Sequence, residues 1–395
     1  MGKLPSRLES KLAKRRAEDS VRNLPVPKNL IGFSSNDYLG FSREPAIHLE
    51  ALEILKTVGC DGNGATGSRL LSGNHVLYPQ LENFLAEHHK AESALVFNSG
   101  YDANLGFFAS VPQRGDLVLY DELIHASIRD GIKMGNAKSH KFAHNDLEDV
   151  KKKVVASLDG PTGNGKQGQS SNNRPEVYIV TESVFSMDGD SPDLLAFSQF
   201  CSEQGYHLIV DEAHATGIYG KGRDLVCALG IQDQVFARII TFGKAMGCHG
   251  AAILGSAALR MYLINFARSF IYTTALSPHS VATILASYHH LKNAGIESLD
   301  VLEQNIRLFK AEINKLGIAD RFVESDSAVH CLLVPGNGTV KSLAGALQQK
   351  GFDVKPILSP TVVEGQERLR FCLHAFNSEE EIVQLVEETK NQLSI

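Results

Sequence analysis

Short apolar runs recur along this chain, and several of them end in a polar or charged side chain. Runs of this kind occupy residues 94–97, 178–182, 207–211 and 237–240. Because they are short, apolar and in part rich in β-branched residues, they predict buried strands. Helix-compatible stretches alternate with these runs, which is typical of an α/β fold with a mostly parallel sheet.

The pattern changes along the chain and predicts three parts. Residues 1–45 are expected to form an N-terminal arm, helical and then extended. Residues 46–285 are expected to form the large α/β domain, and residues 286–395 a smaller α+β domain with strands near 328–334 and 369–373. One low-complexity segment, 160–173, is rich in Gly, Asn, Gln and Ser, so it predicts a surface loop.

Side chains capable of chemistry follow the predicted strands. Lys244 comes shortly after the run 237–240, Asp211 and Glu182 each end a run, and residues 98–101 follow another. In open α/β sheets, ligands bind outside the carboxyl ends of the strands. The sequence therefore predicts one site at that edge of the sheet.

The residue types suggest roles, each with an ordinary alternative. A desolvated Lys244 amine has a lowered pKa and can attack a carbonyl, although a lysine in a Gly-rich turn can also be a plain surface residue. Asp211 could keep a pyridine nitrogen protonated or simply cap a loop. His214 could hydrogen-bond a phenolic oxygen or be a loop histidine. Gly100 and Tyr101 could receive a phosphate at a helix start or form a common turn.

Composition narrows the class of protein. Apolar residues make up 43% and charged residues 21% of the 395 residues, as in a soluble globular protein. The net charge of −6 argues against a nucleic-acid partner, and no apolar run approaches the length of a membrane span. The six cysteines are scattered without metal-type spacing, so we expect reduced thiols in a cytoplasmic protein and no metal site. The Gly-rich stretch 59–67 lacks the Gly-Lys-Ser/Thr ending of a phosphate-binding loop.

Several motifs together resemble the α-oxoamine synthases, which are pyridoxal-phosphate enzymes of the aspartate-aminotransferase fold (fold type I). The similar segments cover nearly the whole chain; they are SSNDYLG at 34–40, GATGSR at 64–69, TESVFSMDGD at 181–190, DEAHATG at 211–217, TFGK at 241–244 and PTV at 360–362. The resemblance implies a large, mostly parallel-sheet domain and a smaller C-terminal α+β domain. It also implies pyridoxal 5′-phosphate as cofactor and a homodimer with shared active sites.

The resemblance also implies site residues. Catalysis would fall to Lys244, His125, Asp211 and His214, with His125 stacking on the cofactor ring, although from spacing alone His125 could equally lie in a helix interface. Thr273 and Thr274 would reach the phosphate from the other subunit. The implied cofactor contacts are Gly100, Tyr101, His125, Glu182, Ser186, Asp211, His214, Thr241, Lys244, Thr273 and Thr274. The implied substrate contacts are Arg22, Asn36, His125, Thr361 and Arg370, with Arg370 and Asn36 suited to a carboxylate.

The residues after the lysine loop, 250–253, and the segment 270–275 favour the members that condense L-alanine with a pimeloyl thioester, carried by coenzyme A or an acyl carrier protein. The alternatives are members that use glycine or serine, a pyridoxal aminotransferase, and a non-catalytic partner subunit. One position departs from the family pattern: Leu358 stands where an arginine is frequent, which puts the contact to the acyl-chain carboxylate in question.

Overall fold

The computed structural model describes residues 4–24, 26, 29–60, 62–158 and 175–393. The segment predicted as a surface loop, 160–173, lies outside these residues. The chain divides into two compact units. The smaller comprises 1–38, 186–190 and 300–395, and the larger comprises 39–185 and 191–299.

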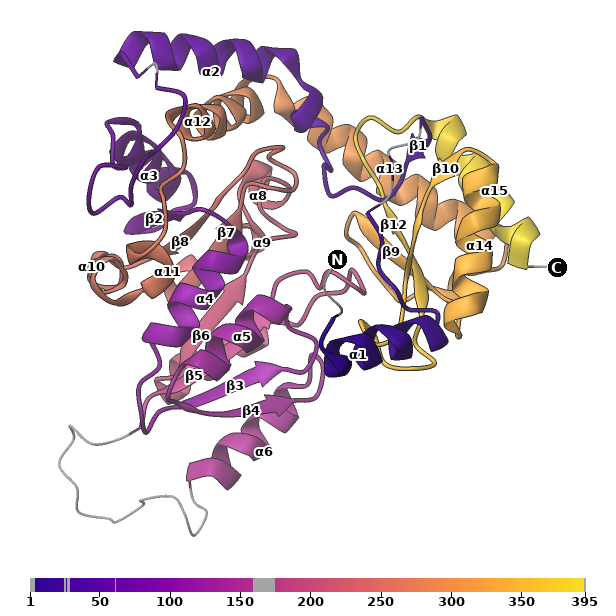
Figure 1. Cartoon of the computed structure of the whole chain (residues 1–395), viewed down its shortest axis with the longest axis horizontal. Helices are drawn as coiled ribbons and strands as arrows, with labels where there is room; N and C mark the ends of the chain where they lie inside the picture. The colour runs from indigo at the N-terminus through magenta and orange to yellow at the C-terminus, as the bar shows by residue number, and fades with distance from the viewer. Residues whose placement is uncertain (1–3, 25, 27–28, 61, 159–174, 394–395) are drawn as a thin grey trace. The chain divides into compact units, whose positions relative to one another are not determined.

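The larger unit is built on a mixed sheet of seven strands in the order β2-β8-β7-β6-β5-β3-β4 (Figure 1). Neighbouring strands from β7 to β4 run parallel, whereas β8 is antiparallel to both β2 and β7. The strands are β2 (Ser93–Phe97), β3 (Leu117–Asp121), β4 (Lys138–Phe142), β5 (Val177–Glu182), β6 (His207–Asp211), β7 (Ala237–Thr241) and β8 (Ala251–Gly255). The prediction of an α/β fold with a mostly parallel sheet is confirmed.

Both faces of this sheet are covered. Along β6, Ile209 faces one apolar cluster, while Leu208 and Val210 face another, as the two-residue period of a strand requires. Helices α4, α5, α10 and α11 supply the first cluster, and α6, α7 and α9 supply the second. A strand buried on both faces has a nearly continuous apolar sequence, which is why these runs were recognisable.

Several helices of the larger unit begin at residues whose side chains cap them. The Ser99 hydroxyl caps α4 and the Ser277 hydroxyl caps α12, which also carries a proline at its first position. The helices are η1 (Phe41–Arg43), α2 (Pro45–Val58), α3 (Leu77–His88), α4 (Gly100–Ser110), α5 (Ala126–Met134), α6 (Leu147–Leu158), α7 (Leu194–Gln204), α8 (Tyr219–Gly222), α9 (Leu225–Leu229), η3 (Gln232–Gln234), α10 (Ala257–Phe266), α11 (Arg268–Ile271), α12 (Pro278–Asn293) and α13 (Gly295–Lys315), which continues into the smaller unit.

The smaller unit combines both ends of the chain. Its main sheet is antiparallel, in the order β11 (Lys355–Ile357), β12 (Arg368–Cys372), β9 (Val329–Leu333). A second pair joins β1 (Ile31–Gly32) to β10 (Phe352–Asp353). Its helices are α1 (Ser6–Ala17), η4 (Ala319–Arg321), α14 (Asn337–Gln349) and α15 (Glu379–Leu393). The sequence placed boundaries near 45 and 285; in the structure the β1–β10 pairing groups the N-terminal arm with the C-terminal residues.

Within the part of the chain that the structure describes, no helix combines the length and apolar character needed to cross a membrane.

A buried histidine makes the stability of the smaller unit sensitive to acid. His330 on β9 is fully buried beside Phe309, and its Nε2 has no hydrogen-bond partner among the described residues. Burial lowers the pKa of His330 to about 3. Because the folded pKa lies below the unfolded one, the unfolded chain binds more protons between pH 6.5 and 3, so stability falls as the pH falls through this range.

Replacing His330 with phenylalanine should reduce this acid sensitivity. Between pH 7 and pH 5, the parent protein should lose about 2 kcal/mol more stability than H330F, as the linkage relation requires. Urea unfolding at the two pH values measures the difference, and exposed His279→Asn serves as the control. Equal losses for parent and H330F would contradict the prediction.

Candidate active site

The register of the large sheet brings three of the predicted site residues together at the carboxyl ends of its parallel strands, which form one edge of the sheet. Glu182 and Asp211, the last residues of β5 and β6, are direct neighbours in the parallel ladder. Asp211 in turn lies opposite Ile239 of β7, two residues before Thr241 at the end of that strand. Lys244 follows in the loop after β7, where it is partly buried. The strand ends therefore form one edge that presents an amine and two carboxyl groups.

The charges of Lys244 and Asp211 act on the pKa values of both Glu182 and His125. Burial, reinforced by the charge of Asp211, raises the pKa of Glu182 to about 8, while Lys244 acts in the opposite direction. Burial also lowers the pKa of His125; Asp211 opposes this shift and Lys244 adds to it. Burial therefore favours the protonated form of Glu182 and the uncharged form of His125, beside a lysine and an aspartate.

Asp211 is buried and held by two donors. Its Oδ2 accepts from Asn104 Nδ2 at 2.9 Å, and its Oδ1 accepts from the Ala213 backbone N–H at 3.0 Å. Both donors stabilise the negative charge of the carboxylate. His214, three residues after Asp211, is also buried in the loop that follows β6. Asn104 did not emerge from the sequence, because one polar residue in an apolar helical stretch carries no distinctive pattern.

His125 forms the N-terminal cap of α5. Its backbone N–H donates to Glu182 Oε1 at 2.6 Å, which fixes the start of the helix against the end of β5. Its Nδ1 lies 2.7 Å from Ser127 Oγ and accepts from the Ser127 backbone N–H at 3.3 Å. Ser127 is fully buried and was likewise not predicted. Ser127 therefore holds the His125 ring through Nδ1, and Glu182 holds the backbone of the same residue.

The N-terminus of α4 lies beside the same strand ends. Helix α4 starts at Gly100 as predicted, and its first internal bond runs from Ala103 to the Ser99 carbonyl, so the N–H groups of Gly100 and Tyr101 precede the hydrogen-bonded turns. A Cβ atom at Gly100 would lie 3.7 Å from Thr241 Oγ1. Such a helix start suits an anion.

Thr273 and Thr274 lie beside the residue that precedes this helix cap. Asn98 Nδ2 donates to Thr273 Oγ1 at 3.1 Å and to the Thr274 carbonyl at 2.5 Å. Asn98 and Thr273 also line a small pocket together with Arg69 and Ser269. Hydrogen bonds from Asn98 thus connect the residues just before α4 with the segment after α11.

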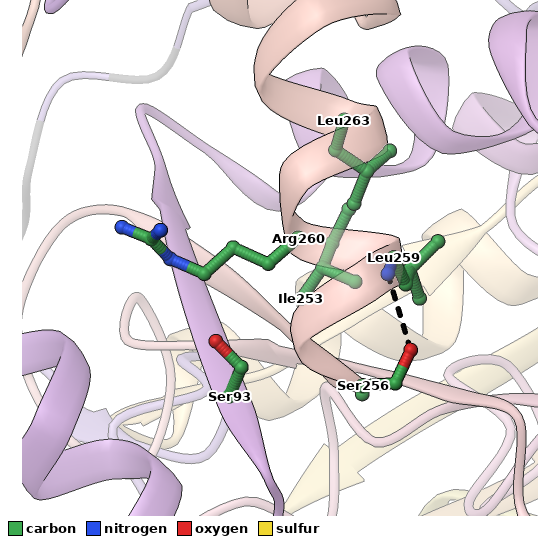
Figure 2. A pocket seen from close by; sticks show the side chains of 7 residues that line it. Ser93, Ile253, Ser256, Leu259, Arg260 and Leu263 are labelled. Atoms are coloured by element: carbon green, nitrogen blue, oxygen red, sulfur yellow. Dashed lines mark hydrogen bonds between the residues drawn. The ribbon is translucent and has the colours of Figure 1, made fainter.

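A second hollow lies at the opposite edge of the sheet (Figure 2). Ser93 begins β2 and pairs with Gly255 at the end of β8, whereas Phe97 and Ala251 form the pair at the Lys244 edge. Apolar side chains and Arg260 line most of this hollow, and Arg260 is engaged with Glu82. The side chains that line this hollow therefore do not form a set suited to catalysis.

The predicted carboxylate residues meet within the smaller unit. Arg370 on β12 is buried; its Nε donates to the Ser186 carbonyl at 2.7 Å and its Nη2 donates to Asn36 Oδ1 at 2.9 Å. The Tyr38 hydroxyl donates to the same Asn36 oxygen at 3.2 Å. The structure therefore groups Ser186 with Arg370 and Asn36.

The two residues expected to contact an acyl group also meet in the smaller unit. Arg22 Nη2 donates to Thr361 Oγ1 at 3.2 Å, in an exposed position. The Thr361 backbone N–H donates to the carbonyl of Leu358, the position that departs from the family pattern. This pairing places a guanidinium next to the turn after β11.

The groups of the larger unit fit pyridoxal phosphate. A lysine amine suits its aldehyde, the buried Asp211 suits its ring nitrogen, and the start of α4 suits its phosphate. Among the described residues, no group of three or more His, Cys, Asp and Glu side chains is arranged to hold a metal ion. The fold and this edge of the sheet define a pyridoxal-phosphate enzyme of fold type I.

Comparison with known proteins places the chain more closely. Residues 28–388 match the family model of class I and II aminotransferases. The chain is 41% identical to the 8-amino-7-oxononanoate synthase of Emericella nidulans, over 98% of this chain and 96% of the relative. It is 36% identical to the synthase of the same name from Chlorobaculum parvum, over 90% of this chain and 87% of the relative.

Comparison with solved structures leads to the same class of enzymes. A serine palmitoyltransferase from S. paucimobilis superposes with a TM-score of 0.85 at 25% identity, covering 99% of this chain and 98% of the other. The 8-amino-7-oxononanoate synthase of Francisella tularensis gives a TM-score of 0.74 at 27% identity, covering 92% and 98%. The chain belongs to the class I and II aminotransferase family and, within it, to the pyridoxal-phosphate-dependent α-oxoamine synthases that include the 8-amino-7-oxononanoate synthases. It is an enzyme of the acyltransferase type, and its cofactor is pyridoxal 5′-phosphate.

Proposed function

We propose that the protein condenses L-alanine with a pimeloyl thioester, carried by coenzyme A or an acyl carrier protein, to give 8-amino-7-oxononanoate, CO₂ and the free carrier, a step of biotin synthesis. The grouping of Lys244 with Asp211, Glu182 and His125 carries the proposal, because it supplies the amine and the charges that this chemistry needs. A non-catalytic partner subunit would not be expected to retain this set. Similarity to named 8-amino-7-oxononanoate synthases over nearly the whole chain supports the choice of substrates.

The chain's own residues would divide the work at the cofactor. Bound pyridoxal phosphate supplies an electron-accepting ring that stabilises negative charge at the α-carbon of the amino acid. Lys244 would hold the cofactor through its amine and would accept the α-proton of the amino acid as general base. Asp211 keeps the ring nitrogen protonated, and His214 hydrogen-bonds the phenolic oxygen. We assign the face of the ring to His125 and a neutral contact to protonated Glu182.

The phosphate is assigned to the start of α4. The N–H groups of Gly100 and Tyr101 bind its oxygens together with the hydroxyl of Thr241. Ser186 is proposed as a further hydroxyl contact to the cofactor. Thr273 and Thr274 are proposed to act on the phosphate of the other subunit, so the enzyme would be a homodimer with shared active sites.

The substrates are assigned to the smaller unit. Arg370, positioned by Asn36 and the Ser186 carbonyl, would grip the carboxylate of L-alanine, since a guanidinium can donate two parallel bonds. Arg22 and Thr361 would contact the pimeloyl chain. None of the six cysteines, all of which lie among the described residues, forms a disulfide bond, which supports a cytoplasmic location.

Replacing Arg370 with leucine should raise the KM for L-alanine by roughly 100-fold, because removing one partner of a buried charged hydrogen bond costs about 2–5 kcal/mol. The KM for the thioester should change much less. Steady-state kinetics with each substrate varied in turn measure both effects. Exposed Arg307→Leu on α13 is the matched control, and an unaltered alanine KM in R370L would move the carboxylate site elsewhere.

The proposed function is tested by adding L-alanine, glycine or L-serine to the purified holoenzyme, each followed by pimeloyl-CoA. We expect a change in the cofactor spectrum with alanine, and CO₂ and free coenzyme A only after the thioester is added. A response confined to glycine or serine would keep the reaction class and overturn the assigned amino acid. Serine is the sharpest rival, since serine palmitoyltransferase structures superpose closely. Transfer of the amino group without thioester consumption would indicate an aminotransferase.

A further inference from the structure

We propose that Asn104 and Ser127 are positioning residues that hold the His125 ring as the tautomer protonated on Nε2 and connect it to Asp211. The inference concerns the site of the proposed function and rests on it for the roles of His125 and Asp211. Neither Asn104 nor Ser127 was among the site residues predicted from the sequence. All four residues lie in the larger unit, on α4, α5 and β6 and at the cap of α5.

Asn104 is the branching point of the network. It lies on α4 with 2% of its surface exposed, and its Nδ2 donates to Asp211 Oδ2 at 2.9 Å and to Ser127 Oγ at 3.1 Å. An amide nitrogen carries two hydrogens, so each of these oxygens receives one. Asn104 thereby fixes the carboxylate and the serine hydroxyl at the same time.

The donors to His125 Nδ1 both come from Ser127. Its hydroxyl, whose oxygen accepts from Asn104, lies 2.7 Å from Nδ1 and can donate its hydrogen there. The same Nδ1 accepts from the Ser127 backbone N–H. A ring nitrogen that accepts two donors carries no proton, and a neutral imidazole must then carry its proton on Nε2. The hydrogen-bond network thus assigns the tautomer.

An unpaired oxygen supports this direction. Asn104 Oδ1 is buried and has no hydrogen-bond partner among the described residues, which costs about 1–3 kcal/mol. Turning the amide over would place this oxygen against the carboxylate of Asp211, where two acceptors would face each other. In this orientation both hydrogens of the amide are donated into the site, and the amide oxygen is the atom without a partner among the described residues.

The network has a chemical consequence for His125. Protonation of Nδ1 would break both hydrogen bonds that Ser127 donates to it. This loss, like burial, disfavours the charged form of the ring. Around the ring, Asp211 and Asp130 favour its charged form, Lys244 and Arg129 oppose it, and Glu182 accepts from its backbone N–H. The uncharged ring keeps one fixed donor, Nε2–H, which suits an oxygen acceptor such as a substrate carboxylate or thioester carbonyl.

The test is histidine ring NMR on the holoenzyme labelled with ¹⁵N-histidine, with His125→Asn used to identify the signal among the 15 histidines. We expect the parent His125 to show an Nε2–H ring whose titration midpoint lies below that of an exposed histidine. In Ser127→Ala the titration midpoint should rise by roughly one pH unit, because a hydrogen bond to the neutral form is lost. Ser127→Thr, which keeps the hydroxyl, should restore the parent midpoint.

Asn104→Leu supplies an independent variant. It removes the donor that orients the Ser127 hydroxyl, so the His125 midpoint should rise as well. In both variants the acid limb of kcat/KM should move to higher pH together with the NMR midpoint. Buried Ser198→Ala on α7, whose hydroxyl donates to the Leu195 carbonyl of its own helix, should change neither quantity.

Two results would overturn the inference: an Nδ1–H tautomer in the parent enzyme, or a His125 midpoint that S127A and N104L leave unchanged. Because the NMR titration needs no substrate, it can fail while the proposed reaction holds. It can also succeed if the amino acid proves to be glycine or serine, so the two failures are distinguishable.

Discussion

Lys244→Ala will lower turnover by on the order of 10⁴-fold, because the variant lacks both the amine that holds the cofactor and the proposed general base. Lys244 follows the end of β7 and is partly buried, and its charge acts on Glu182 and His125. The visible absorbance that pyridoxal phosphate acquires on bonding to a lysine should be lost as well. Release of free coenzyme A from pimeloyl-CoA measures turnover, and the absorbance spectrum measures the bond.

Lys152→Ala is the matched control, since Lys152 is exposed on α6 in the same unit. It should keep the activity and the spectrum of the parent enzyme. Unchanged absorbance together with unchanged turnover in K244A would remove Lys244 from the site and, with it, the proposed mechanism.

Asp211→Asn will lower kcat by roughly 100-fold to 1,000-fold, the size expected when one buried group that stabilises developing charge is removed. The substitution nearly preserves shape but removes the negative charge proposed to keep the ring nitrogen protonated. It also removes the neighbouring charge that helps to raise the pKa of Glu182, so that pKa should fall. Steady-state kinetics and the dissociation constant of pyridoxal phosphate are the measurements.

Asp233→Asn, at an exposed position in η3, changes the same chemical group away from the sheet edge and should behave as the parent enzyme does. If D211N turned over alanine at the parent rate, the ring nitrogen would have to be held by another group. A loss of activity accompanied by complete loss of cofactor affinity would instead assign Asp211 mainly to binding.

Four strands of the large sheet were predicted from their apolar runs, whereas β3 and β8, which are also apolar and buried, were not. The runs at 94–97, 178–182, 207–211 and 237–240 correspond to β2, β5, β6 and β7, because continuous apolar residues are needed between two helical layers. Edge strand β4 has an exposed, polar sequence and gave no such signal. The antiparallel direction of β8 depends on pairing partners that local sequence does not specify.

The site residues were predictable where a reactive side chain lies at or just after the end of a predicted strand. Lys244, Asp211 and Glu182 stand out because charged groups follow apolar runs, and parallel pairing then brings them to one edge. Asn104 and Ser127 lie within helices, where polar residues are common and usually face solvent. Their importance depends on distances to Asp211 and His125 that arise only from tertiary packing. The roles of the individual side chains stay predictions until the variants are measured.

The pairing of β1 with β10 constrains the order in which this protein can assemble during synthesis. Residues 31–32 leave the ribosome long before their partners at 352–353 do. All strands of the large sheet, by contrast, have been made by residue 255. The larger unit can therefore fold on the nascent chain while the N-terminal arm waits, and closing the smaller unit requires contacts across almost the entire sequence, which are slow to form. Chaperones would be expected to bind the growing chain at this N-terminal arm while β1 still lacks its partner β10.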